Sequence, residues 1–284
     1  MYYSASSPLP VVHHELQMKI LLALFALASV ASATVVWDGR FNDYSTSADF
    51  NKWSWSNQVG SYQTYIYVSV PYEPTHTQSN SPHIGAKRHL LGLPSEVNSR
   101  TLLPPVRRKG AKIIINGSST WNGGPMLRTE LIPQTTNSLS GHLFFHVSLQ
   151  IPTVNPPDPA YEHQIVFWES HFADIKYGQL SGQNGVADTL QVITGGKSIW
   201  SVTPVKGTWY NFILETGSPG GLWVSTGSSP LQKVFTGSLN GNGGTDWHIG
   251  ALRLPINGQP QQITETDLFY SGIYVEDSGP TTQP

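Results

Sequence analysis

The segment Met126–Ile132 has the two-residue period of a β-strand and carries a cation and an anion on one face. Arg128 and Glu130 share that face, while the opposite face carries Leu127 and Leu131 and is apolar enough to enter a core. An exposed ion pair of this kind contributes little to stability. In a site, however, the arginine would keep the glutamate ionised, and an ionised glutamate suits the work of a general base.

A second carboxylate lies further along the chain, where Glu169 ends the apolar run Ile165–Trp168. The hydrolysis of a glycosidic bond requires two carboxyl groups. One donates a proton to the leaving oxygen, and the other, ionised, activates water or attacks the sugar. Glu130 and Glu169 are therefore candidates for these two carboxyl groups, and the charge of Arg128 favours Glu130 as the base and leaves Glu169 as the acid. Glu162, in the same segment as Glu169, is the alternative second carboxylate.

Three histidines lie close to these carboxylates in the sequence pattern. His248 opens a late strand beside a glycine-rich turn, where it could support the pair or be an ordinary histidine. His163 and His171 share strand parity with Glu169, but neither HxH nor HExxH spacing occurs, so we predict no metal ion and no cofactor. The sequence also contains no P-loop, GxGxxG or GxSxG motif.

The composition limits the classes of partner. The chain has 284 residues, of which 12% are charged, with a net charge of -2 and no cysteine. This balance does not suit nucleic acid or an acidic membrane surface, and the lack of cysteine excludes a disulfide scaffold and thiol chemistry. With 9 tryptophans and 12 tyrosines, the chain suits a neutral, ring-shaped ligand, and we take a monomer as the default.

Five tryptophans could either stack on sugar rings or fill the core, and we expect only one or two of them to touch a ligand. They are Trp53, Trp55, Trp121, Trp168 and Trp247. Trp53 and Trp55 share a face at the two-residue period, so that pair could form a platform for a sugar.

From Thr34 onward, short β-rich runs alternate with clusters of glycine, proline, asparagine and serine. The predicted strands are 64–70, 111–115, 126–132, 141–150, 163–168, 188–194, 209–216, 221–225, 245–254 and 268–276. Strands punctuated in this way predict an all-β fold, a sandwich or jelly roll, as one domain over residues 34–284. The stretch 72–109 has no clean period and is a doubtful insert, either an active-site loop or translated intron.

The N-terminus resembles an export signal. Residues 18–33 have a basic start, an apolar run and an Ala-x-Ala ending, which predicts a secretory signal peptide behind an N-terminal extension, and a mature chain that is extracellular and not membrane-bound. Translation would then start at Met18. Asn116 begins an Asn-Gly-Ser sequon and is the predicted glycosylation site.

Several long motifs in order resemble glycoside hydrolase family 131, a family of secreted fungal β-glucanases. The resemblance runs from about Val35 to about Glu276, apart from the insert, and rests on the blocks 36–44, 50–60, 128–135, 162–165, 169–172 and 246–248. It implies a β-jelly-roll with an open substrate groove across the concave sheet. It also implies hydrolysis of β-1,3, β-1,6 and β-1,4 linkages in β-glucans by an inverting mechanism with two glutamates.

Residue by residue, the resemblance matches Glu130 and Glu169 to the two candidate carboxylates of the family, and Arg128 and His248 to its supporting groove residues. The insert departs from the family pattern. Two further residues, Gln164 and Trp121, join the expected substrate-binding set.

Two other functions remain open on the same architecture. Jelly-roll polysaccharide lyases, which cleave polyuronates by β-elimination, are faintly echoed by Gln164-Ile165 and by 268–274, but Val166 stands where those lyases have a histidine. A non-catalytic, glucan-binding lectin would need the aromatic residues and Arg128 but not two converging glutamates.

Overall fold

The computed structural model describes residues 1, 33–53, 63–72, 108–121, 124–135, 139–185, 187–240, 246–256 and 264–284. The chain divides into two units, Met1–Ser32 and Ala33–Pro284, and all that follows concerns the second unit. The predicted signal peptide up to Ser32, Trp55, the glycine-rich turn before His248 and residues 73–107 of the doubtful insert lie outside the described residues. None of the helices in the described ranges has the length and hydrophobicity that crossing a bilayer requires.

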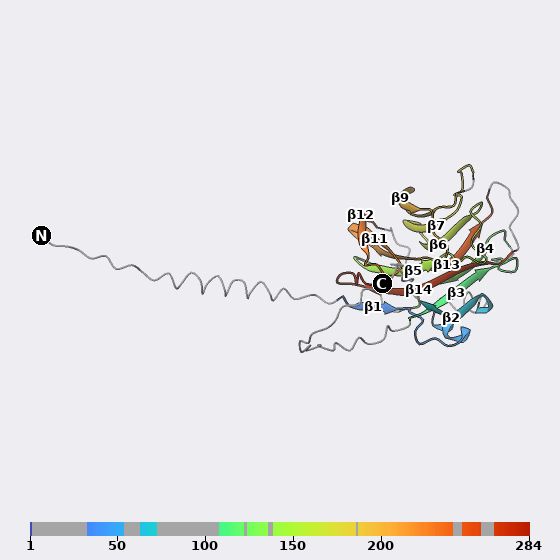
Figure 1. Cartoon of the computed structure of the whole chain (residues 1–284), viewed down its shortest axis with the longest axis horizontal. Helices are drawn as coiled ribbons and strands as arrows, with labels where there is room; N and C mark the ends of the chain where they lie inside the picture. The colour runs from blue at the N-terminus through green and yellow to red at the C-terminus, as the bar shows by residue number, and fades with distance from the viewer. Residues whose placement is uncertain are drawn as a thin grey trace, which may run out of the picture. The chain divides into compact units, whose positions relative to one another are not determined.

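Two antiparallel sheets make up the second unit (Figure 1). The larger sheet has the order β12-β11-β10-β5-β14-β3-β2, with β1 pairing to β14, and the six-stranded sheet has the order β4-β13-β6-β7-β8-β9. The strands are β1 Val35–Asp38, β2 Ile66–Tyr72, β3 Arg108–Ile115, β4 Leu127–Leu131, β5 Phe144–Gln150, β6 Glu162–Trp168, β7 Ala173–Tyr177, β8 Leu190–Thr194, β9 Lys197–Val202, β10 Trp209–Glu215, β11 Gly217–Thr226, β12 Gln232–Leu239, β13 Trp247–Leu254 and β14 Thr266–Glu276. Two 3₁₀ helices, Ser47–Lys52 and Gln63–Tyr65, precede β2.

The core lies between the two sheets and is rich in aromatic residues. The ring of Phe145 on β5 meets Trp168 on β6 at 4.9 Å and Trp247 on β13 at 5.0 Å, both edge to face. Edge-to-face contacts of this kind add to the hydrophobic gain from burying large rings. Trp53 is also buried, against Trp37. Three of the five tryptophans therefore fill the core, and Trp53 does not form an exposed platform.

The all-β jelly-roll prediction is confirmed, and each predicted strand has a counterpart among β2–β6, β8, β10, β11, β13 and β14. Strands β1, β7, β9 and β12 were not predicted from the sequence. The residues of β12 are mostly exposed at the edge of the larger sheet, so their pattern lacks the apolar face that identifies a strand. Strand β7 has only five residues, too few for the alternation of Asp174 and Lys176 with core residues to identify it as a strand.

The position of Phe145 yields a test of the core. Phe145→Ala removes a ring that joins both sheets, and such a truncation costs about 3–5 kcal/mol of the free energy of unfolding. Denaturant unfolding measures the loss. Val234→Ala, at an exposed position of β12, is the matched control and should change stability by less than about 0.5 kcal/mol. Equal, small effects of the two substitutions would contradict this description of the core.

Candidate active site

Strand β4 presents Arg128 and Glu130 on the face of the six-stranded sheet that points away from the core. Leu127 and Leu131 enter the core from its other face, so the predicted parity is confirmed. The side chain of Glu130 is 0% exposed. A buried carboxylate requires a compensating charge or hydrogen bonds, and its partners therefore define the site.

One oxygen of Glu130 gathers those partners. Its Oε2 accepts a hydrogen bond from Nε of Arg128 at 3.0 Å and also contacts Nη2 of that guanidinium. His248, on β13, places Nδ1 at 2.9 Å from the same oxygen. In the described residues, Oε1 of Glu130 is buried and has no hydrogen-bond partner. The carboxylate is thus clamped through Oε2 alone.

The close approach of β13 to β4 depends on Gly250, which pairs with Glu130. A Cβ atom at this position would lie 2.2 Å from the carbonyl oxygen of Thr129 and 2.7 Å from Cα of Glu130. Any larger residue would therefore push the two strands apart. Below them, the buried hydroxyl of Tyr270 donates to the Gly250 carbonyl. Burial, aided by the charge of Glu130, raises the pKa of Tyr270 well above its usual value.

Glu169 approaches the other side of the same histidine. It lies in the turn after β6, where its backbone N–H donates to the Asp246 carbonyl at 3.1 Å. Its side chain is 64% exposed and places Oε2 at 3.2 Å from Nε2 of His248, without hydrogen-bond geometry. The imidazole of His248 therefore lies between Glu130 and Glu169, and the structure brings the predicted pair together around it.

A β-bulge in β6 breaks the strict alternation that the sequence analysis assumed. Gln164 pairs with Lys176 of β7 and Val166 pairs with Ile175, so β6 has one extra residue between two consecutive residues of β7. Ile165 and Val166 both enter the core. Phe167 in turn joins the outer face and stacks on His248. A bulge re-aims the side chains that follow it.

The bulge separates the two histidines whose parity the sequence had matched. His163 is fully buried, and burial, together with the charge of Arg253, lowers its pKa to about 3. His171 lies in the exposed turn and pairs with Asp174 at 3.0 Å, and this hydrogen bond raises its pKa. Within the described ranges, no group of three or more histidine, aspartate or glutamate side chains could hold a metal ion.

The side chain of Glu162, the alternative second carboxylate, is held by hydrogen bonds within the protein. Its Oε1 accepts hydrogen bonds from Gln164 and Lys176, each at 3.0 Å, and its Oε2 accepts the backbone N–H of Ser181 at 2.7 Å. Burial raises the pKa of Glu162, but the hydrogen bonds from Gln164 and Ser181 and the charge of Lys176 outweigh it, and the pKa is lowered to about 2. A group this acidic holds no proton near neutral pH and cannot be a general acid.

The remaining predicted residues lie at different distances from Glu130. Trp121 is half-buried, and its ring centroid lies 5.4 Å from Cζ of Arg128, a cation–π contact beside the pair. Gln164 is buried and bonds to Glu162, away from the contacts of Glu130. Asn116, in the turn after β3, uses its side-chain oxygen to accept the backbone N–H of Ser118.

Several residues of this face were not singled out from the sequence: Phe167, Asp174, Lys176 and Gly250. None belongs to a motif with a chemical signature. The bulge that aims Phe167 at His248, and the pairing that brings Gly250 opposite Glu130, are properties of register between strands distant in sequence. A single sequence carries no direct signal for them.

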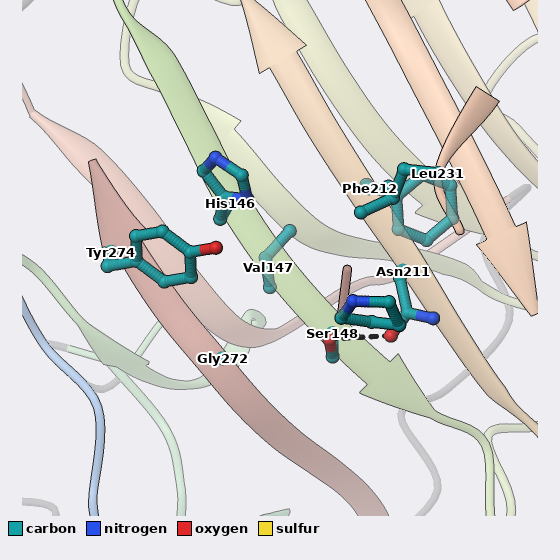
Figure 2. Close-up of a pocket in the computed structure, with 9 residues that line it drawn as sticks. His146, Val147, Ser148, Asn211, Phe212, Leu231, Gly272 and Tyr274 are labelled. Carbon is teal, nitrogen blue, oxygen red and sulfur yellow. Dashed lines mark hydrogen bonds between the residues drawn. The ribbon is translucent and has the colours of Figure 1, made fainter. Parts of the chain in front are cut away.

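A small pocket lies on the larger sheet rather than at this pair (Figure 2). Its polar side chains pair with one another or with neighbouring groups. The hydroxyl of Ser148 donates to the side-chain oxygen of Asn211 at 2.7 Å, and His146 lies 2.8 Å from Glu276 while stacking on Tyr274. The candidate carboxylates take no part in this pocket.

Comparison with known proteins identifies the family to which this fold belongs. Residues 35–281 match the model of the glycoside hydrolase 131 catalytic N-terminal domain. A GH131 β-glucanase catalytic domain from Podospora anserina is 38% identical, with a TM-score of 0.68, covering 88% of this chain and 98% of its own. The catalytic domain of a family 131 protein from Coprinopsis cinerea is 32% identical, with a TM-score of 0.65, covering 88% and 97%. No curated protein matches.

The sandwich fold and these matches define an enzyme that hydrolyses glycosidic bonds. The chain belongs to glycoside hydrolase family 131. The resemblance stated from the motifs is thereby confirmed.

The environment of Glu162 predicts a distinctive pH dependence of stability. Its folded-state pKa, about 2, lies below its usual 4.5. The ionised group therefore stabilises the fold above pH 4.5, by up to about 3 kcal/mol, and this contribution is lost as the pH falls toward 2. Urea unfolding at several pH values should show Glu162→Gln well below the unsubstituted protein near neutrality, with the gap narrowing in acid. A gap that does not change with pH would contradict this account.

Proposed function

We propose that this enzyme hydrolyses β-glucans, with Glu130 and Glu169 as its two catalytic carboxylates. The observation that carries the proposal is His248, whose two ring nitrogens lie 2.9 and 3.2 Å from oxygens of Glu130 and Glu169. The same histidine joins a fully buried carboxylate to an exposed one, and a glycosidase needs two carboxyl groups with different tasks. The name of the Podospora relative, a β-glucanase, supports the substrate class.

The contacts of His248 support Glu130 as the base and Glu169 as the acid. The 2.9 Å contact favours a proton on Nδ1 of His248, donated to Glu130. In the neutral ring Nε2 then carries no proton, so the 3.2 Å approach of Oε2 of Glu169 is more favourable when that carboxyl group carries one. Arg128 balances the charge of Glu130 from the other side. These contacts support Glu130 as the base that activates water.

The proposed reaction inverts the anomeric carbon. The two carboxylates approach opposite nitrogens of one imidazole ring. Their separation is therefore wider than the roughly 5–5.5 Å of a retaining pair and suits the roughly 6.5–9.5 Å of an inverting pair. Glu169 donates its proton to the leaving oxygen, while Glu130 removes a proton from the water that attacks from the opposite face of the sugar.

The outer face of the six-stranded sheet is the proposed open groove for the glucan. Arg128, His248, Gln164 and Trp121 are proposed to bind the sugars there, the indole by stacking and the others by hydrogen bonds. We propose a broad tolerance for β-1,3, β-1,6 and β-1,4 linkages, and no cofactor.

The export, the domain extent and the glycosylation of the chain are also proposed from its sequence. Residues 18–33 act as the export signal, residues 34–284 form the single catalytic domain, and Asn116 carries a glycan. The enzyme then acts outside the cell as a monomer.

The first experiment takes the chain from Thr34 onward and offers it laminarin, a β-1,6-glucan, a soluble cellulose derivative and a polyuronate. New reducing ends from the glucans are expected, without the ultraviolet absorbance of an unsaturated uronate. Absorbance on the polyuronate would mean β-elimination, and binding without cleavage would mean a lectin. Either outcome would overturn the proposed hydrolysis, and NMR of the fresh product reports whether the anomeric carbon is inverted.

Amide substitutions test the two carboxylates individually. Glu130→Gln and Glu169→Gln keep the side-chain shape but remove the acid or base, and each should lower kcat by roughly 10²–10⁴-fold. Glu162→Gln is the matched control, since it alters a carboxylate of the same sheet face that lacks a role in the chemistry. Circular dichroism checks that each variant is folded. Near-normal hydrolysis by folded Glu130→Gln or Glu169→Gln, or a greater loss in folded Glu162→Gln, would refute the assignment.

A further inference from the structure

Three rings form a continuous stack on the outer face of the six-stranded sheet. The ring of Phe167 lies 4.6 Å from that of His248 with an interplanar angle of 9°. On its other side lies His171, at 5.2 Å and 10°. Phe167 and His248 are directly paired residues of β6 and β13, and such cross-strand neighbours are the closest side-chain contacts of a sheet.

The far end of this stack is fixed in place. His171 adopts a left-handed backbone conformation, with φ of 53°, and its N–H donates to the Trp168 carbonyl at 2.7 Å. Its Nδ1 lies 3.0 Å from the buried carboxylate of Asp174. That carboxylate also lies 3.5 Å from Nζ of Lys176. The ring of His171 is therefore held at its backbone and at its side chain.

His248 needs such support because its function requires one ring plane. The last torsion of a histidine side chain is broad and roughly two-fold, so the ring has no strong preference of its own. Hydrogen bonding restrains Nδ1 through Glu130, but Nε2 has no partner with hydrogen-bond geometry among the described residues. Besides the contacts of Nδ1 with Glu130 and, at 3.4 Å, with Nη2 of Arg128, face-to-face contact with Phe167 restrains the plane that brings Nε2 to Glu169.

We propose that Phe167, His171 and Asp174 are positioning residues, which hold the ring of His248 in the plane where it meets both Glu130 and Glu169. The inference rests on the proposed function for its catalytic consequence, but the orientation of His248 can be measured without any substrate. Phe167, His171 and Asp174 act through His248, and none of these three residues is assigned a contact with sugar.

The charges around His171 are consistent with this support. Asp174, through its hydrogen bond, raises the pKa of His171, while burial and Lys176 oppose it and Glu169 assists it. A histidine that is more often protonated presents a cation to the face of Phe167, and such a cation is attracted to an aromatic ring. The stack is then stabilised by the same turn that carries Glu169.

The test compares Phe167→Leu with two further variants. Phe167→Leu removes the ring and should lower kcat on the glucan by about 10- to 100-fold, because displacing a catalytic group by about 1 Å costs this much in rate. KM should change less than about threefold. Phe167→Tyr keeps the ring and should restore most of kcat. His171→Ala, at an exposed position, should reproduce part of the loss without the risk of unfolding.

Nitrogen NMR of the His248 imidazole supplies the readout that packing alone would not change. The unsubstituted protein should show one tautomer, with the proton on Nδ1, and Phe167→Leu should show a mixture. Phe144→Leu is the matched control, because Phe144 is a buried phenylalanine beside an exposed histidine on the other sheet. It should change neither the His248 signals nor kcat.

Each outcome decides one claim. If Phe167→Leu and His171→Ala leave the His248 signals unchanged and keep kcat within about twofold, the positioning role is wrong. If the unsubstituted protein cleaves no glucan, the proposed function fails, and the imidazole signals still decide the positioning role by themselves.

Discussion

The candidate site depends on one buried carboxylate oxygen. Glu130 lies without solvent exposure on the outer face of a sheet, and its Oε2 takes both the guanidinium of Arg128 and Nδ1 of His248. Leaving such a charge unpaired would cost several kcal/mol, so the clamp and the packing around it must form together. Gly250 permits the close approach of β13 that brings His248 into reach. The close approach of β13 to β4 thus determines which groups surround the charge of Glu130.

The positions of the candidate site residues were predictable because each stands on a strand with clear parity or beside one. Arg128 and Glu130 share a face through the two-residue period alone, and the core position of Leu127 and Leu131 confirms it. The motifs gave the family. Most strands of the two sheets were also predictable, because their apolar residues recur at the expected spacing.

The remaining features could not be predicted because they depend on pairing between distant segments. A one-residue bulge in β6 moves Phe167 to the outer face, where strict alternation would place it in the core. Composition could not show which tryptophans lie in the core and which lie beside the candidate site. Trp168 and Trp247 fill the core, whereas Trp121 meets Arg128 at the surface. Glu162 and Glu169 look equivalent in the sequence and differ only in their neighbours.

Strand β4 occupies the end of the six-stranded sheet, so it has a neighbouring strand, β13, on one side only. Its other edge is held by isolated contacts, such as the Arg128 N–H donating to the Ser119 carbonyl and the bridge between Thr120 and Leu127. Elements with few ladder partners open at lower free energies than the whole domain does. All five residues of β4 are buried, however, and Leu127 and Leu131 enter the core. The strand that carries Glu130 is therefore held in the sheet mainly by its packing against the core.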